Sequence, residues 1–338
     1  GLTLAAGGDL RNCKEVLDTM VRQLHDGLFP NIGKGDKAAY NSIDAPMWFF
    51  WAVQEYDKAL GEPGTVWKNY GSKMKSILTA FREGVNPGLR MDANGLIWAR
   101  QPGKALTWMD AVVRGVPVTP RAGYAVEINA LWYNAVCYML KLAEEAKDNT
   151  FIKEWKDMPE LIRTSFVETF WNEETGYLAD YVDEKGQNLD VRPNQVFACS
   201  LTYSPITDDM KERVLKVVTR ELLTPKGLRT LSPKNPKYHG HYEGNQDERD
   251  NAYHQGTVWP WLIGAYIEAN LKLYGKQFLP EAKELLEGFE EDMALYGLCS
   301  IAEVYDGDPP HHPNGSISQA WSVGEVLRSM KLIRKYEN

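Results

Sequence analysis

The sequence predicts an all-α protein in which an inner ring of buried helices is wrapped by an outer ring of amphipathic ones. Two observations predict this fold class. Apolar residues recur with a helical period along most of the chain, and segments that are apolar on every side alternate with segments that have a charged face. A helix that is apolar all round must be buried all round, whereas an amphipathic helix keeps one face in solvent.

The N-terminal half shows this alternation directly. Gly1–Ala6 is a short apolar stub, and Leu10–His25 has apolar residues at helical spacing with charges between them. Ile43–Leu60 contains the run MWFFW and has almost no polar face. Thr65–Glu83 is charged and amphipathic, and Ala125–Ala146 is rich in aromatic residues.

The C-terminal half continues in the same order. Ile152–Trp171 is charged, Arg192–Tyr203 is short and apolar, Met210–Leu223 is amphipathic and Thr257–Tyr274 is apolar all round. A segment with one charged face and a closing inner helix complete the series: Phe278–Tyr296 and Ser316–Tyr336. The eleven segments predict one (α/α)6 toroid over residues 1–338 that lacks its first outer helix.

Connections from an outer helix to the next inner one are predicted to be long. They are Asp26–Ser42, Val85–Tyr124, Asn172–Val191 and Leu223–Gly256. Long structured loops in a compact domain are usually functional. Because all four enter inner helices from the same side, we expect them to gather at one mouth of the ring. Short β-like pieces within them are expected at Gly95–Arg100 and Gly176–Val182.

Composition limits the kind of ligand. The 338 residues carry 38 Lys and Arg against 46 Asp and Glu, and the net charge is −8. This acidic balance, without a basic cluster, argues against nucleic acid or an anionic membrane as a partner. Aromatic residues make up 11% of the chain. Aromatic rings on an acidic background suit a neutral, hydroxyl-rich ligand.

The four cysteines are far apart and form no CxxC pair: Cys13, Cys137, Cys199 and Cys299. They are expected to be buried thiols in a reducing compartment, which favours the cytoplasm. No zinc or other metal site is predicted, and no cofactor motif such as a phosphate loop is present.

Polar and aromatic residues crowd into blocks at the start of the inner helices or just before them. Each block also has a structural explanation. Asp44 is in the position of an N-cap, Asn194 and Gln195 are suited to satisfying loop backbone, and Arg192 is suited to pairing with a buried carboxylate. Ten such blocks at one mouth favour a site.

The blocks resemble the C-terminal amylo-α-1,6-glucosidase domain of glycogen debranching enzymes. The most specific are Trp108-Met109-Asp110 and Arg192-Pro193-Asn194-Gln195, and the similarity extends from Gly1-Leu2-Thr3-Leu4 to Gln319-Ala320-Trp321-Ser322. It implies hydrolysis, with inversion, of α-1,6-linked glucose stubs in glycogen or a related branched oligosaccharide, with no cofactor. Other enzymes on this toroid, with trehalase-like, α-mannosidase-like or phosphorylase chemistry, remain alternatives. A glucan-binding toroid without catalysis is another.

The resemblance also implies a first outer helix and a Trp-Gly-Arg-Asp loop ahead of Gly1, which this sequence does not contain. We therefore expect an opened wall that exposes apolar faces of the Gly1–Ala6 stub and of the final helix near Trp321. Such a patch would favour self-association.

Inverting glycoside hydrolysis needs two carboxyl groups about 6.5–9.5 Å apart, one protonated and one ionised. An aromatic surround raises the pKa of the acid by desolvating its charged form. Asp110 follows Trp108-Met109 and has such a surround. The resemblance makes Asp110 the general acid, and it makes Glu303 the base that activates water.

The remaining candidates are assigned to substrate binding. Trp259 is also explained as a space-filling core residue, and Glu127 as a carboxylate that only supports the site. The predicted substrate-binding residues are Asn41, Asp44, Trp108, Arg121, Glu127, Arg192, Asn194, Gln195, His254, Gln255, Trp259 and Trp321.

Overall fold

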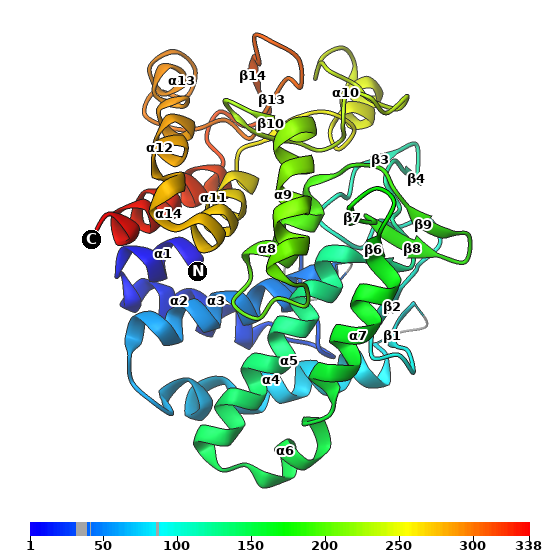
Figure 1. Cartoon of the computed structure of the whole chain (residues 1–338), viewed down its shortest axis with the longest axis vertical. Helices are drawn as coiled ribbons and strands as arrows, with labels where there is room; N and C mark the ends of the chain where they lie inside the picture. Colours follow the sequence, from blue (N-terminus) through cyan, green and yellow to red (C-terminus); the bar gives the residue numbers. More distant parts are fainter. Residues whose placement is uncertain (32–38, 41, 86–87) are drawn as a thin grey trace.

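The computed structural model describes residues 1–31, 39–40, 42–85 and 88–338, and most of this part of the chain is helical (Figure 1). The helices are α1 (Leu2–Gly7), α2 (Leu10–Arg22), α3 (Asp44–Leu60), α4 (Thr65–Glu83), α5 (Val126–Ala146), α6 (Asn149–Trp155), α7 (Met158–Phe170), η2 (Pro193–Gln195), α8 (Val196–Ser200), α9 (Asp208–Leu222), α10 (Gln246–Ala252), α11 (Leu262–Tyr274), η3 (Gly275–Phe278), α12 (Leu279–Glu287), α13 (Glu290–Leu295) and α14 (Ala320–Glu337).

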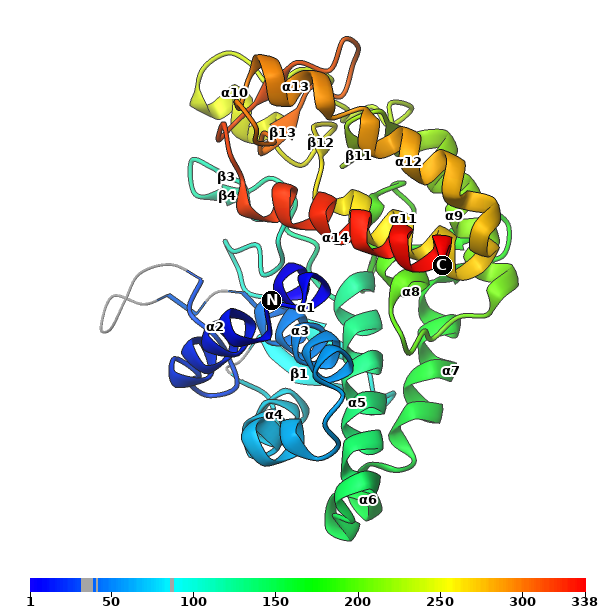
Figure 2. The ribbon, with the colours of Figure 1, turned by 90° about the vertical axis from the view of Figure 1, so that its left-hand side faces the viewer.

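The helices predicted to be inner contact one another in chain order. Helix α1 contacts α3, α3 contacts α5, α5 contacts α8, α8 contacts α11, and α11 contacts α14. Helix α14 in turn contacts α1, and Figure 2 shows these two beside each other near the N-terminus. The inner helices therefore contact each other in a closed cycle.

The helices predicted to be outer pack against neighbouring members of this cycle. Helix α2 contacts α1 and α3, and α4 contacts α3 and α5. Helices α6 and α7 contact α5, α9 contacts α8 and α11, and α12 contacts α14. The prediction of a helical protein is confirmed as far as most of the described chain is helical, and the ring of alternating inner and outer helices stays a prediction.

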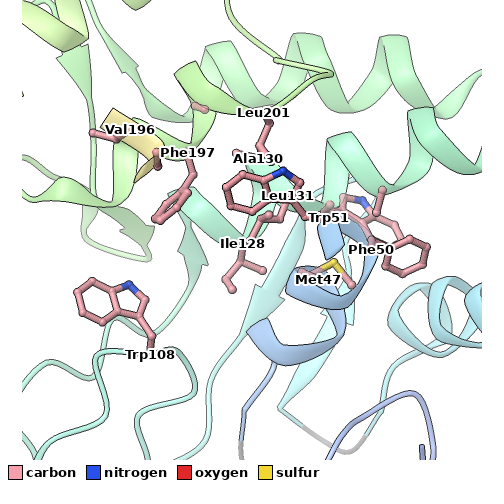
Figure 3. Close-up of a cluster of buried hydrophobic side chains, with 14 of the residues drawn as sticks. Met47, Phe50, Trp51, Trp108, Ile128, Ala130, Leu131, Val196, Phe197 and Leu201 are labelled. Carbon is pink, nitrogen blue, oxygen red and sulfur yellow. The ribbon is translucent and has the colours of Figure 1, made fainter. Parts of the chain in front are cut away.

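The core lies where the inner helices meet. Figure 3 shows side chains of α3, α5 and α8 gathered there, among them Trp51, Leu131 and Phe197. Helix α5 is buried along nearly its whole length because other helices or loops cover it on every side. An apolar surround of this kind stabilises a helix mainly through the area that it removes from water.

Two predicted helices are divided in the structure. Ile152–Trp171 becomes α6 and α7, and Pro159 lies in the first turn of α7, where its missing N–H leaves no helical bond unmade. Phe278–Tyr296 becomes η3, α12 and α13, with the break at Gly288. A Cβ atom there would lie 2.5 Å from the carbonyl oxygen of Pro225, so the backbone approaches closely.

Three other boundaries differ from the prediction. Helix α11 begins at Leu262 rather than Thr257, because Val258–Trp259 forms a strand and Pro260 follows it. Helix α8 has only five residues and follows the short helix η2. Helix α10 lies inside a predicted loop and begins with a capping box between Asn245 and Glu248.

Short antiparallel strands occupy the long loops and tie them to one another. Three sheets have two strands each: β1 (Leu89–Met91) with β2 (Ile97–Ala99), β3 (Val112–Val113) with β4 (Val116–Pro117), and β6 (Trp171–Asn172) with β7 (Tyr177–Leu178). A three-stranded sheet has the order β5 (Tyr124–Ala125), β8 (Tyr181–Asp183), β9 (Gly186–Asn188). A five-stranded sheet has the order β10 (Leu223–Thr224), β11 (Gly227–Arg229), β12 (Val258–Trp259), β13 (Val304–Tyr305), β14 (Pro313–Asn314). Both predicted β-like pieces contain strands.

The five-stranded sheet matters most for the site. Leu228 pairs with Trp259, and Val258 pairs with Tyr305, so the loops that lead into α11 and α14 are held side by side. The three-stranded sheet does the same for the loops that lead into α5 and α8.

The structure also tests the predicted burial of the cysteines and shows the surface between α1 and α14. Cys13 and Cys199 are buried and Cys137 is half-buried, but Cys299 is exposed in the turn after α13, so the prediction of four buried thiols is wrong for Cys299 and only partly met by Cys137. A groove of about 250 Å³ lies between α1 and α14, where Leu327 and Met330 are 48% and 40% exposed. Self-association through this surface stays a prediction. In the described part of the chain, no helix is long and apolar enough to cross a bilayer.

Candidate active site

A cavity of about 720 Å³ lies among α1, α2, α3, α8, α14 and the loop ahead of β3. Its walls are mainly apolar and rich in aromatic rings. The aromatic lining residues are Trp48, Phe49, Trp51, Trp108, Phe197, Tyr253, Trp259, Trp261 and Trp321. Carboxyl groups of Asp44, Asp110 and Glu325 also line it.

The indoles are held in a fixed arrangement. Trp261 stacks on Trp321, with ring centroids 5.2 Å apart and an interplanar angle of 9°, and on Phe197, with centroids 5.5 Å apart. Trp108 meets Trp261 edge-on at 5.1 Å. The buried indole N–H of Trp261 has no acceptor among the described residues. The cavity therefore offers flat apolar ring faces in fixed positions.

Asp110 is positioned by the loop that follows β2. Its side chain remains exposed at the cavity, while the surrounding protein desolvates the carboxyl group and raises its pKa to about 6. The negative charge of Asp44 raises it further. A carboxyl group with this pKa keeps a proton for donation at mildly acidic pH.

Glu303 precedes β13 and is half-buried. Its Oε1 accepts hydrogen bonds from the Tyr253 hydroxyl at 2.6 Å and from the Gln319 amide at 3.2 Å, and its Oε2 accepts one from the Ser316 backbone N–H at 2.9 Å. Burial raises the pKa of Glu303, but these bonds outweigh it and hold the pKa below its ordinary value. Glu303 is thus held as a carboxylate. It reaches the cavity through Tyr253 and does not line it.

The loop that carries Asp110 is held by a buried polar network. Arg121 binds both oxygens of Glu127 at 2.5 Å, reaches Asp180 at 2.6 Å and donates to the Thr107 hydroxyl at 3.1 Å. All four residues are buried. Arginine is suited to this role because its planar guanidinium donates in two directions at once.

Asn194 connects this network to the same loop. It donates to Asp180 at 2.7 Å and accepts from the Trp108 indole at 2.8 Å. The Thr119 hydroxyl donates to the Met109 carbonyl at 3.0 Å. Thr107, Trp108 and Met109 are therefore each fixed by a buried partner, which leaves Asp110 at the end of a rigid segment.

A second buried group lies around Arg192. Its guanidinium donates to the His254 carbonyl at 2.7 Å and to the Gln255 side chain at 2.6 Å. Gln195 donates to the Arg192 carbonyl and accepts from the Leu178 N–H. The His254 ring stacks on Trp259, with centroids 5.3 Å apart, and burial lowers its pKa to about 3, so the ring is neutral.

The cavity brings together some of the predicted residues. Those that line it are Asp110, Asp44, Trp108, Trp259 and Trp321. Glu303 lies next to the cavity beyond Tyr253. The others lie behind the cavity walls, in the two buried polar groups described above: Arg121, Glu127, Arg192, Asn194, Gln195, His254 and Gln255. Contact of these residues with a substrate stays a prediction. Their hydrogen bonds to one another and to neighbouring residues hold the loops around the cavity in place. Asn41 lies outside the described residues.

Several lining residues were absent from the predicted set. Trp48, Trp51 and Phe197 belong to helices apolar enough to look like pure core, and Trp261 follows a proline in the same kind of run. Glu325 lies in α14, and Asp180, which joins Arg121 to Asn194, lies between two short strands. For the aromatic residues, an apolar helix pattern predicts burial equally well with and without a place in the cavity wall, so sequence alone did not identify them.

In the part of the chain that the structure describes, no group of three His, Cys, Asp or Glu side chains is arranged to hold a metal ion. The cavity is lined by carboxyl groups among aromatic rings. Helical packing around an aromatic cavity, with one carboxyl of raised pKa and one held ionised, defines a protein suited to acid–base chemistry on a neutral, hydroxyl-rich ligand.

Comparison with known proteins narrows this class. Residues 1–328 match the family model described as amylo-alpha-1,6-glucosidase, so the chain belongs to this family of glucosidases. It is also similar to the glycogen debranching enzyme of Saccharomyces cerevisiae. The two are 26% identical over 96% of this chain and 28% of the yeast protein. The chain thus spans little more than a quarter of the relative's length.

Proposed function

We propose that this chain is an inverting glycoside hydrolase that removes single α-1,6-linked glucose residues from glycogen or a limit dextrin. Membership of the amylo-alpha-1,6-glucosidase family and similarity to a glycogen debranching enzyme support the substrate. The aromatic walls of the cavity support a sugar ligand, because flat rings pack on the apolar faces of pyranoses and leave hydroxyl groups free for hydrogen bonds.

The proposed fold is the (α/α)6 toroid, with the chain as one catalytic domain. The closed cycle of contacts from α1 through α3, α5, α8, α11 and α14 supports it. So does the packing of the other helices outside this cycle.

The opposite pKa shifts of Asp110 and Glu303 are the observation that carries the mechanism. Asp110, protonated, gives its proton to the glycosidic oxygen as the bond from that oxygen to the anomeric carbon breaks. Glu303, ionised, takes a proton from the water that attacks the anomeric carbon from the opposite face. The glucose produced has the β configuration.

Substrate contact is assigned to the lining residues. Trp108, Trp259 and Trp321 pack against sugar rings, and Asp44 accepts a hydrogen bond from a hydroxyl group. The buried groups around Arg121 and Arg192 hold the loops in register. Preorganised groups of this kind favour the transition state because they need no rearrangement during the reaction.

The test is release of glucose from a dextrin that carries single α-1,6-linked glucose residues, followed by proton NMR. We expect glucose to appear first as the β anomer, and we expect no release from linear maltopentaose. The Asp110→Asn variant is the control for activity from a contaminating enzyme.

Other outcomes identify the alternatives. Initial α-glucose contradicts inversion. Glucose 1-phosphate formed only in the presence of phosphate indicates a phosphorylase. Binding of the dextrin without any release indicates a glucan-binding protein.

A further inference from the structure

Tyr253 lies in the cavity wall and is also hydrogen-bonded to Glu303. It directly follows α10, and its ring is part of the cavity wall together with Asp110. Its hydroxyl group donates to Oε1 of Glu303 at 2.6 Å. Among the described residues, three groups donate to the Glu303 carboxylate, and of these only Tyr253 also lines the cavity.

The ring of Tyr253 is fixed on several sides. It lies 4.7 Å from the His254 ring, 4.8 Å from the Trp259 ring and 5.6 Å from the Tyr242 ring, centroid to centroid. The Trp259 indole also donates to the Tyr253 backbone carbonyl at 2.8 Å. A hydroxyl group on so constrained a ring can hold its acceptor in one orientation.

We propose that Tyr253 is a positioning residue that fixes the orientation and the ionised state of the Glu303 carboxylate at the edge of the cavity. The inference rests on the proposed function, in which Glu303 activates water. A hydrogen bond from a neutral donor to a carboxylate is stronger than one between neutral groups. The three donors take both acceptor positions of Oε1 and one of Oε2, which leaves one position on Oε2 to accept from water.

The surroundings of the pair are consistent with this role. Burial and the nearby Glu303 raise the pKa of Tyr253, so its hydroxyl group stays protonated and remains a donor. The other groups around the carboxylate are the Gln319 amide, the Ser316 N–H and the Tyr242 hydroxyl group, which itself lies near Arg249 and Asp250. Asp110 faces Tyr253 from the cavity side.

The variant Tyr253→Phe tests the inference, because it keeps the ring and its packing and removes only the hydroxyl group. We expect kcat to fall about tenfold to a hundredfold, in line with loss of a hydrogen bond to a charged group. KM should change by less than about threefold, and the acidic limb of the kcat profile should move to higher pH. A purely structural role of Tyr253 would leave the midpoint of that limb in place.

Tyr242→Phe is the matched control. It removes a hydroxyl group from the same ring cluster without removing a hydrogen bond to Glu303. We therefore expect kcat to stay within about twofold of the native value, and the midpoint of the acidic limb to agree with the native midpoint within experimental error. An equal effect of both substitutions would show that loosening of the cluster, and not the Tyr253 bond, is responsible.

Titration of the carboxyl groups gives a readout that needs no substrate. With ¹³C-labelled glutamate, the Glu303 signal is assigned by its absence in Glu303→Gln, and its midpoint is measured in native protein and in Tyr253→Phe. We expect a higher midpoint in the variant. An unchanged midpoint overturns the inference whether or not the protein releases glucose. A raised midpoint in a protein that releases no glucose keeps the Tyr253–Glu303 link and rejects the proposed function.

Discussion

Asp44 and Asp110 line one cavity although they come from different elements, the start of α3 and the loop ahead of β3. Asp44 is buried and accepts hydrogen bonds from the Ser42 hydroxyl group and the Trp48 indole. Burial raises the pKa of Asp44, and the charge of Asp44 adds to burial in raising the pKa of Asp110 to about 6. Two carboxyl groups that face one site resist being ionised together.

We therefore expect a bell-shaped dependence of kcat/KM on pH. Asp110 must be protonated, so activity falls as pH rises through about 6. Glu303 must be ionised and its pKa is lowered, so activity falls on the acidic side only below the ordinary pKa of a glutamate. Initial rates across pH on the branched dextrin measure both limbs. A profile flat through pH 6 would contradict the assignment of Asp110.

The substitution Asp44→Asn should move the alkaline limb to lower pH, because it removes a negative charge that raises the pKa of Asp110. Asparagine keeps the size of the side chain: its carbonyl oxygen can accept from the Trp48 indole, and its amide can donate to the Ser42 hydroxyl group. The exposed Asp209→Asn serves as the control and should leave the limb in place. If Asp44→Asn also leaves it in place, Asp44 is neutral across this range and does not act on Asp110.

Asp110→Asn should lower kcat on the branched dextrin by about 10²–10⁴-fold, because the leaving oxygen then departs without a proton. Fluoride leaves without such help, so the loss on α-glucosyl fluoride should be much smaller. Glu303→Gln should lose activity on both substrates, because attack by water is impaired in each. Equal losses on the two substrates in Asp110→Asn would remove Asp110 from the role of acid.

Helical periodicity was sufficient to predict two of the long core helices closely. In Ile43–Leu60 and Ala125–Ala146 the apolar pattern is set by burial on all sides, and the structure has α3 and α5 almost as expected. Periodicity failed where one predicted helix is divided into two although the apolar pattern continues across the break, as near Pro159 and at Gly288. Those breaks depend on which backbone lies nearby, and periodicity contains no such information.

The candidate site was predictable to a similar extent. The position of Asp110 beside aromatic residues indicated a desolvated carboxyl group, and its pKa is raised as expected. Sequence could not distinguish residues that face the cavity from residues behind it. Arg121 and Glu127 are six positions apart, and only their tertiary contact turns them into a buried pair. The bond between Tyr253 and Glu303 likewise joins loops fifty residues apart.

The burial of Arg121 leads to a prediction about stability. Arg121→Leu leaves Glu127 and Asp180 buried without their main partner, which should lower the free energy of unfolding by about 3–5 kcal/mol. Arg100→Leu is the control, because Arg100 pairs with Glu184 at the surface and its loss should cost at most about 1 kcal/mol. Urea unfolding measures both. Similar costs for the two would contradict a supporting role of the buried network.

The last prediction concerns Gly315, which lies against the Glu303 carboxylate. Its φ is 71°, and a Cβ atom on it would lie 2.6 Å from Oε2 of Glu303. Gly315→Ala should therefore push the carboxylate out of place, and we expect kcat to fall by at least about tenfold, since small displacements of a reacting group are costly.

Gly103→Ala separates this displacement from backbone strain. Gly103 has a φ of 73° with nothing within 4 Å of the added Cβ position, so both substitutions carry the same cost of a left-handed conformation, about 1–2 kcal/mol. Thermal unfolding should show similar losses for the two variants, whereas kcat should fall only in Gly315→Ala. If Gly315→Ala keeps the native kcat, the orientation of Glu303 does not limit the reaction, and Glu303 is then not the base.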